Sequence, residues 1–350
     1  MLGYWCWKVL KQEEIMIIFS SVTGCRIAKG HRSVTKERGT MVQDLERNGA
    51  GLPIRELGKT GLKVSIVGFG GGHYIRSDIN EQTSVRLVQN AIDEGITFMD
   101  TAWEYGQGES ERRMGLALKG RRDQVTLMTK VCGRDAKTAE EQLHQSLRRL
   151  QTEVIDVWQF HEINYDNDPD LIFRVNGAID TALAARAAGK IRFIGFTGHK
   201  SPHILKKMLD QDFAWDTCQL PINVLDAHYR SFQNEILPEL NHRDIGVIGM
   251  KSLGGRGQLI TALGLSAAQC RGYALSLPIS TLSCGIDSLE NLQQDLEIAH
   301  NFSPMSLEEQ RALLSSVSEE AGDGRHEWFK STQYYDSQYH RDQHGFPPIN

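Results

Sequence analysis

From about residue 53 onward, short apolar runs alternate with segments whose apolar residues recur every three or four positions. The runs predict buried strands, and the segments between them, such as 84–94, 138–150 and 288–300, predict amphipathic helices. Eight runs have the strand character: 64–69, 96–99, 125–128, 154–160, 191–196, 215–220, 245–250 and 279–284. Strands that alternate with helices build a parallel sheet, and eight units of about 25–35 residues suit closure into a barrel. We therefore predict an α/β fold, a (β/α)8 TIM barrel with N- and C-terminal extensions.

Three regions follow from this pattern. Residues 1–50 lack a sustained period, and we expect a poorly ordered N-terminal extension there, with Met41 as an alternative start. Residues 51–303 carry the predicted barrel. Residues 304–350 begin with an amphipathic segment, 305–318, and then become aromatic and polar, which suits either a wall of a substrate pocket or a surface strap over or beside the barrel.

Composition excludes several classes of function. The chain has 39 basic and 44 acidic residues, a net charge of −5, so it offers no general cationic field for a nucleic acid. Its six cysteines are far apart and form no Cys-x-x-Cys pair, which argues against a zinc ribbon or an iron–sulfur cluster and suits free thiols in the cytoplasm. The apolar run 15–19 is far shorter than the ~20 residues of a membrane span. We expect a cytoplasmic protein with no metal site, membrane anchor or nucleic-acid partner.

Polar residues end or follow six of the predicted strands in succession. They are Asp100, Lys130, His161, the segment 195–199, Gln219 and Lys251. The C-terminal ends of the strands in such a barrel meet at one mouth, where the βα loops carry the chemistry. Any one of these residues is explained as a strand cap, but six in succession predict a site.

The segments around these residues resemble the aldo-keto reductase family. The resemblance is carried by Phe-Met-Asp-Thr-Ala at 98–102 with Tyr-Gly at 105–106, by Met-Thr-Lys-Val at 128–131, by Asp-Val-Trp-Gln-Phe-His at 156–161, and by Ile-Arg-Glu-Leu-Gly-Lys-Thr-Gly-Leu at 54–62. It extends through the helix at 289–300. The resemblance implies a catalytic tetrad of Asp100, Tyr105, Lys130 and His161, with NADP(H) or NAD(H) as the hydride carrier.

The residue types in this tetrad suit reduction of a carbonyl group. The reaction needs a hydride for the carbon and a proton for the oxygen, and a free tyrosine with a pKa near 10 is a reluctant acid at neutral pH. We expect Lys130 to lower the pKa of Tyr105 and Asp100 to keep that lysine charged. His161 would then direct the carbonyl oxygen. The alternatives are a structural Asp100–Lys130 ion pair, a packed aromatic ring and a satisfied core histidine.

The second half of the chain supplies the predicted cofactor site. The glycine-rich loop at 249–257 resembles the family's seventh-strand loop, whose backbone amides approach a pyrophosphate. Gln219 matches the glutamine that binds the nicotinamide amide, Thr197 stands where a serine is usual, and His199 is a candidate to replace an asparagine that is Gly198 here. The predicted cofactor-binding residues are Gly71, Thr197, Gln219, Met250, Lys251, Ser252, Leu253, Gly254, Gly255, Arg256, Gln294 and Asp295. No Arg or Lys occurs between Cys284 and Asp295 to pair with a 2′-phosphate, so the preference between NADPH and NADH stays open.

Three functions are compatible with these residues. The first is an NAD(P)-dependent oxidoreductase that reduces a small aldehyde or ketone, or oxidises the alcohol, by direct hydride transfer. The second is a nucleotide-binding redox sensor subunit with little turnover, which the N-terminal extension suits. The third is a metal-dependent hydrolase that uses Asp100, His161 and Glu162 as ligands, but the sequence lacks the histidine cluster of such sites. The sequence favours the first.

Overall fold

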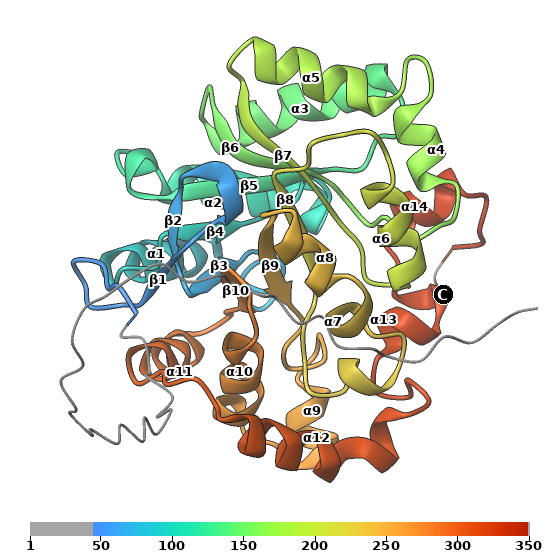
Figure 1. The fold of residues 1–350 in the computed structure, drawn as a ribbon. Helices are drawn as coiled ribbons and strands as arrows, with labels where there is room; N and C mark the ends of the chain where they lie inside the picture. Colours follow the sequence, from blue (N-terminus) through green and yellow to red (C-terminus); the bar gives the residue numbers. More distant parts are fainter. Residues whose placement is uncertain (1–44, 349–350) are drawn as a thin grey trace, which may run out of the picture. The chain divides into compact units, whose positions relative to one another are not determined.

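A computed structural model describes residues 45–348, and eight parallel strands in it close into a barrel (Figure 1). The strands follow one another around the barrel in chain order, and the last pairs with the first. Their bounds are β3 Val67–Gly70, β4 Phe98–Asp100, β5 Thr126–Val131, β6 Ile155–Phe160, β7 Ile191–Thr197, β8 Thr217–Pro221, β9 Gly246–Met250 and β10 Thr281–Gly285. The predicted (β/α)8 barrel is confirmed, and each strand overlaps one of the eight apolar runs.

The first predicted strand, 64–69, is two strands in the structure. Lys63–Ser65 forms β2, which pairs antiparallel with β1, Ile54–Glu56, and only the part from Val67 onward joins the barrel. The chain changes partner at Ile66, whose N–H donates to the carbonyl oxygen of Pro53 at 3.0 Å. The apolar run does not show where the pairing partner changes, because the strands on both sides of the change are buried.

The β1–β2 hairpin supplies apolar side chains to the inside of the barrel. Leu57 and Val64 are fully buried in one cluster with four residues of the barrel strands: Phe98, Met128, Val157 and Ile248. Because β1 and β2 precede the first barrel strand, the hairpin closes the end of the barrel opposite to the strands' C-terminal ends. The open mouth is therefore left to the βα loops.

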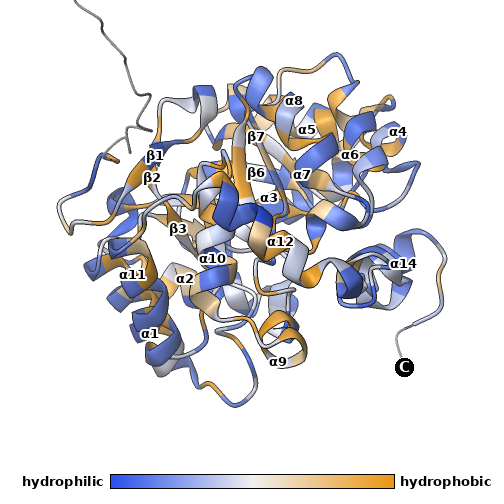
Figure 2. Cartoon of the chain, turned by 60° about the horizontal axis from the view of Figure 1, so that its bottom comes forward, coloured by the Kyte–Doolittle hydropathy of each residue, from blue (hydrophilic) through white to orange (hydrophobic). Residues whose placement is uncertain are grey.

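Helices surround the barrel (Figure 1). They are α1 Glu81–Asp93, α2 Glu109–Ala117, α3 Ala136–Leu150, α4 Asp168–Phe173, α5 Ala178–Ala187, α6 Pro202–Leu209, α7 Phe232–Glu235, α8 Leu237–His242, α9 Gln258–Leu263, α10 Ala267–Ser276 and α11 Leu289–His300. Short 3-10 turns add η1 Gly58–Thr60, η2 Tyr105–Gly108, η3 Arg122–Gln124 and η4 Asp226–His228. Figure 2 colours much of α1 as hydrophilic, which is expected of an outer helix that faces solvent on one side.

Helix starts follow from capping chemistry. The predicted helix at 84–94 begins earlier, at Glu81, because the Asn80 side chain accepts a hydrogen bond from the Thr83 N–H at 2.9 Å. At α11 the Ser288 side chain caps the helix in the same way through Asn291. Periodicity therefore finds the helix, and the capping residue sets where it starts.

The C-terminal region holds the helix α12, Leu307–Ala321, followed by α13 Trp328–Ser331, η5 Gln333–Tyr335 and α14 Gln338–Gln343. We call residues 323–348 the tail. The tail returns to the side of the mouth beside α4, where His344 lies 3.1 Å from Asp168 (Figure 1). The tail therefore belongs to the surroundings of the mouth.

The N-terminal extension predicted at 1–50 falls mostly outside the described residues. The described part, 45–50, contacts the following strands and helices: Arg47 donates to the carbonyl oxygen of His300 at 3.2 Å, and Asn48 donates to that of Gly95 at 2.8 Å. Within residues 45–348, no helix has both the length and the apolar character needed to cross a membrane.

Candidate active site

The structure brings the four predicted catalytic residues to the same end of three neighbouring strands. Asp100 ends β4, Lys130 lies near the end of β5, and His161 directly follows β6. Tyr105 begins η2, in the loop that leaves β4. Because the three strands are parallel and adjacent, their C-terminal ends place these side chains together at the mouth.

Lys130 is the centre of this group and is only 1% exposed. Its ammonium donates to Oδ1 of Asp100 and to the carbonyl oxygen of Thr101, the latter at 2.7 Å, and lies 3.5 Å from Oη of Tyr105. The other Asp100 oxygen accepts from Gln219 at 2.7 Å and from Ser283 at 2.6 Å. The Asp100–Lys130 pair is thus buried, hydrogen-bonded on both sides and fixed in position.

The net shift of the Tyr105 pKa is opposite to the expected lowering. Burial of the phenol, followed by the nearby Asp100 carboxylate, raises its pKa well above 10. Asp100 offsets the charge of Lys130, and the 3.5 Å contact is too long to outweigh loss of solvation. The phenol is therefore protonated at neutral pH, and release of its proton requires a group such as the nearby Lys130 ammonium to stabilise the phenolate.

His161 lies next to Tyr105 in a T-shaped ring contact with a centroid distance of 5.5 Å. Its Nδ1 is 3.1 Å from Oε1 of Glu104. Burial, followed by the charge of Lys130, lowers the His161 pKa well below 6.5, so the imidazole is neutral. A neutral imidazole beside a protonated phenol provides two groups that can hydrogen-bond to one carbonyl oxygen.

A cavity of about 580 Å³ opens beside this group. Asp100, Tyr105 and Gln219 line it, together with these predicted cofactor residues: Gly71, Met250, Lys251, Ser252, Leu253, Gly255, Arg256, Gln294 and Asp295. Two predicted cofactor residues are not among its lining: Thr197, which ends β7 and is buried, and Gly254. The cavity thus joins the end of the tetrad near Tyr105 to the loop after β9 and the start of α11.

Three features of the cavity fit a nicotinamide dinucleotide. Oε1 of Gln219 is buried and has no hydrogen-bond partner, so it is available to an amide N–H. A Cβ at Gly71 would lie 2.6 Å from the carbonyl oxygen of Asp100, so only glycine allows the backbone of the cavity wall to pass this close to the end of β4. Arg271, Lys251 and Arg256 bring positive charge to the lining, as a pyrophosphate requires.

Sequence reasoning missed two arginines in this cavity. Arg271, on α10, forms a buried ion pair with Asp295 through contacts of 2.7 and 3.0 Å, and also donates to Ser252. Arg76 reaches Asp287 at 3.1 Å from the loop after β3. A search of the local segment from Cys284 to Asp295 could not find either cation, because each comes from another element.

His199 does not take the predicted place of the missing asparagine. It is 3% exposed and is absent from the cavity lining. Its Nδ1 lies 3.2 Å from the carbonyl oxygen of Phe329, and its Nε2 lies 3.2 Å from Asn164, so it contacts the tail. Asparagine would not fit at position 198 itself, because a Cβ there would lie 2.5 Å from the Ile163 carbonyl oxygen.

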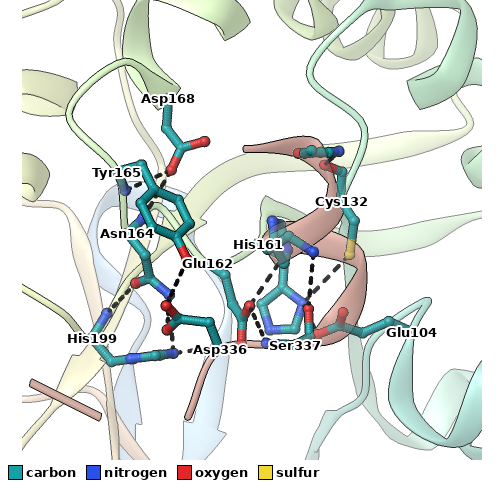
Figure 3. Close-up of polar contacts among 12 residues, drawn as sticks. Glu104, Cys132, His161, Glu162, Asn164, Tyr165, Asp168, His199, Asp336 and Ser337 are labelled. Carbon is teal, nitrogen blue, oxygen red and sulfur yellow. Dashed lines mark hydrogen bonds and ion pairs between the residues drawn. The ribbon is translucent and has the colours of Figure 1, made fainter. Parts of the chain in front are cut away.

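The tail forms a wall beside His161 (Figure 3). Asp336 is fully buried and accepts from Asn164 at 3.1 Å and Tyr165 at 2.7 Å, while Ser337 N–H donates to Glu162 at 3.2 Å. Tyr335 lines the cavity. The tail therefore contributes a side chain to the cavity, as the pocket-wall interpretation expects.

Comparison with known proteins agrees with this geometry. A sequence model described as the aldo/keto reductase family matches residues 66–272, more than half of the chain. The aldo-keto reductase YhdN of Bacillus subtilis is 37% identical over 151 residues, which are 39% of this chain and 44% of that protein. The L-galactose dehydrogenase of Arabidopsis thaliana is 31% identical over 220 residues, 58% of this chain and 66% of that protein. The chain thus spans less than two thirds of the length of these relatives.

Solved structures share the fold at low sequence identity. The holo form of aldo-keto reductase AKR11C1 from Bacillus halodurans has a TM-score of 0.66 at 23% identity, over 79% of this chain and 99% of that chain. An aldo/keto reductase from Klebsiella pneumoniae, solved in complex with NADP and acetate, has a TM-score of 0.63 at 22% identity, over 75% of this chain and 95% of that chain.

Proposed function

This chain belongs to the aldo/keto reductase family, and from that premise we propose that it is an NAD(P)-dependent oxidoreductase that reduces an aldehyde or ketone to an alcohol, or catalyses the reverse reaction. The observation that carries the proposal is the contact of the buried Lys130 ammonium with both Asp100 and Tyr105 at the edge of the cavity. A hydride carrier is supported by the fit of the cavity and by the NADP in the Klebsiella pneumoniae relative.

A bound reduced nicotinamide would supply the hydride for the carbonyl carbon. Tyr105 would donate the proton to the carbonyl oxygen, since burial keeps its phenol protonated. His161 would orient that oxygen. Lys130, held by Asp100, would stabilise the phenolate that remains after proton transfer. In the reverse direction, the phenolate beside Lys130 accepts the proton of the alcohol.

The cofactor would be held mainly by the loop after β9 and by the start of α11. Gln219 Oε1 would accept from the nicotinamide amide, because it is the partnerless atom at that end of the cavity. Lys251 and Arg256 would meet the pyrophosphate. Arg271, through Asp295 and Ser252, would hold the loop and the helix together around the dinucleotide.

The first experiment is a titration of the purified protein with NADPH and NADH, followed by intrinsic tryptophan fluorescence. We expect saturable binding of at least one cofactor, and oxidation of that cofactor when a simple aromatic aldehyde is added. Binding without turnover across a broad aldehyde and ketone panel would favour a redox sensor. Failure to bind either cofactor would contradict the proposal.

Replacing Lys130 with methionine should lower kcat by roughly tenfold or more, because one lost charge contact of about 1.4 kcal/mol corresponds to a factor of ten. The Kd for the cofactor should change little, since the cavity lining does not include Lys130. Steady-state kinetics and the fluorescence titration measure the two quantities. Lys190→Met is the matched control, because Lys190 contacts only His144, at 2.8 Å, among the described side-chain bonds. A Lys130 variant that loses affinity but keeps its kcat would contradict the role given to Lys130.

A further inference from the structure

Four side chains with metal-binding atoms converge on the side of His161 that faces Glu104. They come from four segments: Glu104 in the loop after β4, Cys132 directly after β5, His161 directly after β6, and His340 in α14 of the tail. Their ligand atoms all lie within 4.8 Å of one another. We propose that this cluster binds one divalent transition-metal ion, with Zn²⁺ as the preferred ion.

The donor set and its spacing suit tetrahedral zinc. One thiolate, two imidazoles and one carboxylate are the ligand types that Zn²⁺ takes in proteins. With bonds of about 2.0–2.3 Å, neighbouring ligand atoms in a tetrahedron lie about 3.3–3.8 Å apart. His161 Nδ1 lies 3.1 Å from Glu104 Oε1 and 3.8 Å from Cys132 Sγ (Figure 3). The other pairs of ligand atoms also lie within 4.8 Å of each other.

Two buried atoms in the cluster lack a hydrogen-bond partner. They are Oε2 of Glu104 and Nε2 of His340, and the His340 side chain is fully buried. Nε2 of His340 lies 3.7 Å from Oε2 of Glu162, which is beyond hydrogen-bond distance. An unsatisfied buried polar atom costs about 1–3 kcal/mol, so a ligand that meets both atoms would remove a substantial penalty. These two atoms are the independent sign that the cluster is built for a ligand.

The neighbouring Arg134 does not occupy the site. Its Nη2 lies 3.4 Å from Nδ1 of His340, but it is closer to two carbonyl oxygens, those of His161 at 2.7 Å and Glu162 at 3.1 Å. The two protons of Nη2 are satisfied by these carbonyls, and its contact with His340 is at Nδ1, so Arg134 leaves Nε2 of His340 to a metal.

The charges also favour a cation at this point. Glu104 and Glu162 are both shielded from solvent, and the guanidinium of Arg134 already pairs with Asp168 at 2.8 Å. A divalent ion would balance the Glu104 carboxylate and the Cys132 thiolate. Without the ion, Glu104 and Cys132 would have to keep their protons for the buried charges to be balanced.

The site would link the tail to the barrel and would determine which ring nitrogen of His161 carries the proton. His340 is the only one of the four ligands outside the strand-end loops, so the ion would connect α14 to the ends of β4, β5 and β6. Metal on Nδ1 leaves the ring proton of a neutral His161 on Nε2, where it can donate to a carbonyl oxygen. This last consequence rests on the proposed function; the metal site does not.

The test measures metal binding directly, on the full-length protein after removal of metal with a chelator. We expect one Co²⁺ per chain, with the near-ultraviolet charge-transfer band of a cobalt–thiolate bond, and displacement of that band by one equivalent of Zn²⁺. The absence of the band or of saturable Zn²⁺ binding in the wild-type protein would overturn the proposal. An inactive protein that binds Zn²⁺ would instead refute the proposed oxidoreductase function alone.

Two variants assign the ligands. Cys132→Ser should abolish the charge-transfer band and weaken Zn²⁺ by at least ~100-fold, since even an outer partner of a metal ligand accounts for ~10–100-fold. His340→Gln should keep the band and weaken Zn²⁺ by at least ~10-fold. The matched controls are Cys218→Ser, a buried thiol on β8, and His344→Gln, which contacts Asp168. If a control variant loses binding as its partner does, or if the two ligand variants bind Zn²⁺ normally, the cluster is not the site.

Discussion

Replacing Tyr105 with phenylalanine should lower kcat for carbonyl reduction by at least ~100-fold, the lower end of the range for loss of a general acid. The change removes only the hydroxyl group. The ring keeps its edge contact with His161, at 5.5 Å between centroids, and its position 4.8 Å from the Lys130 ammonium. The Kd for the cofactor should therefore stay within about twofold of the wild-type value, a change of less than about 0.5 kcal/mol.

The measurement is steady-state turnover of an aromatic aldehyde at saturating cofactor, followed as loss of reduced-cofactor absorbance. Tyr334→Phe is the control, because Tyr334 carries the same group on the tail but is 68% exposed. It should keep its kcat. Normal turnover in the Tyr105 variant would show that another group supplies the proton, whereas a loss confined to cofactor affinity would place Tyr105 in the binding site only.

The barrel was predictable from the sequence because its signal is local. Each barrel strand is a short apolar run, and each is separated from the next by a segment that covers it, so periodicity alone orders the elements. The same signal fails at residues 64–69, where β2 and β3 are both buried but belong to different sheets. The two strands differ only in the strands with which they pair, and pairing cannot be read from the residues of the run itself.

The position of the tetrad was also predictable, because parallel strands deliver their C-terminal residues to one mouth. The direction of the Tyr105 pKa shift was not predictable. Lys130 alone would lower the Tyr105 pKa, but burial and the carboxylate of Asp100 act in the opposite direction and outweigh it. The sign of the shift depends on distances and on solvation, and neither can be read from residue types.

Contacts between segments that are far apart in the sequence were also not predictable. Arg271 and Asp295 are 24 residues apart, and Arg76 and Asp287 are 211 residues apart. The cluster behind His161 joins residues as far apart as Glu104 and His340, so it carries no motif that a sequence search would find. Such pairs form because the barrel brings loop ends together, and the tail adds a further segment to the same mouth.

The tail is attached at a second point by a buried ionic cluster, and its loss should have the largest effect on stability. Lys330 is fully buried, and its ammonium donates to Asp226 at 2.6 Å, Glu327 at 3.0 Å and the Tyr229 carbonyl oxygen at 2.8 Å. Lys330→Met preserves most of the side-chain volume but leaves two buried carboxylates without their cation. We expect the free energy of unfolding to fall by about 3–5 kcal/mol, the usual cost of breaking a buried ion pair.

Urea unfolding of the wild-type protein and the variant measures this difference. Lys206→Met is the control, because its contacts with Asp210 and Glu239 are made by a side chain that is 52% exposed, and such surface pairs contribute about 0–1 kcal/mol. Restoring charge balance with Asp226→Asn in the same chain should recover part of the loss. If the Lys330 and Lys206 variants lost equal free energies of unfolding, the buried carboxylates of Asp226 and Glu327 would not be left unpaired by the loss of Lys330.

The loss should also depend on pH in a defined direction. Burial raises the pKa of Asp226 and of Glu327 even with Lys330 present, and removal of the ammonium raises both further. The folded variant then binds protons at pH values where the unfolded chain, with carboxyl pKa values near 4, has released them. Its stability falls as pH rises through that window, so the deficit relative to the wild-type protein should be larger at pH 8 than at pH 5. A deficit that grows toward acid pH would contradict the assignment of uncompensated carboxylates as its cause.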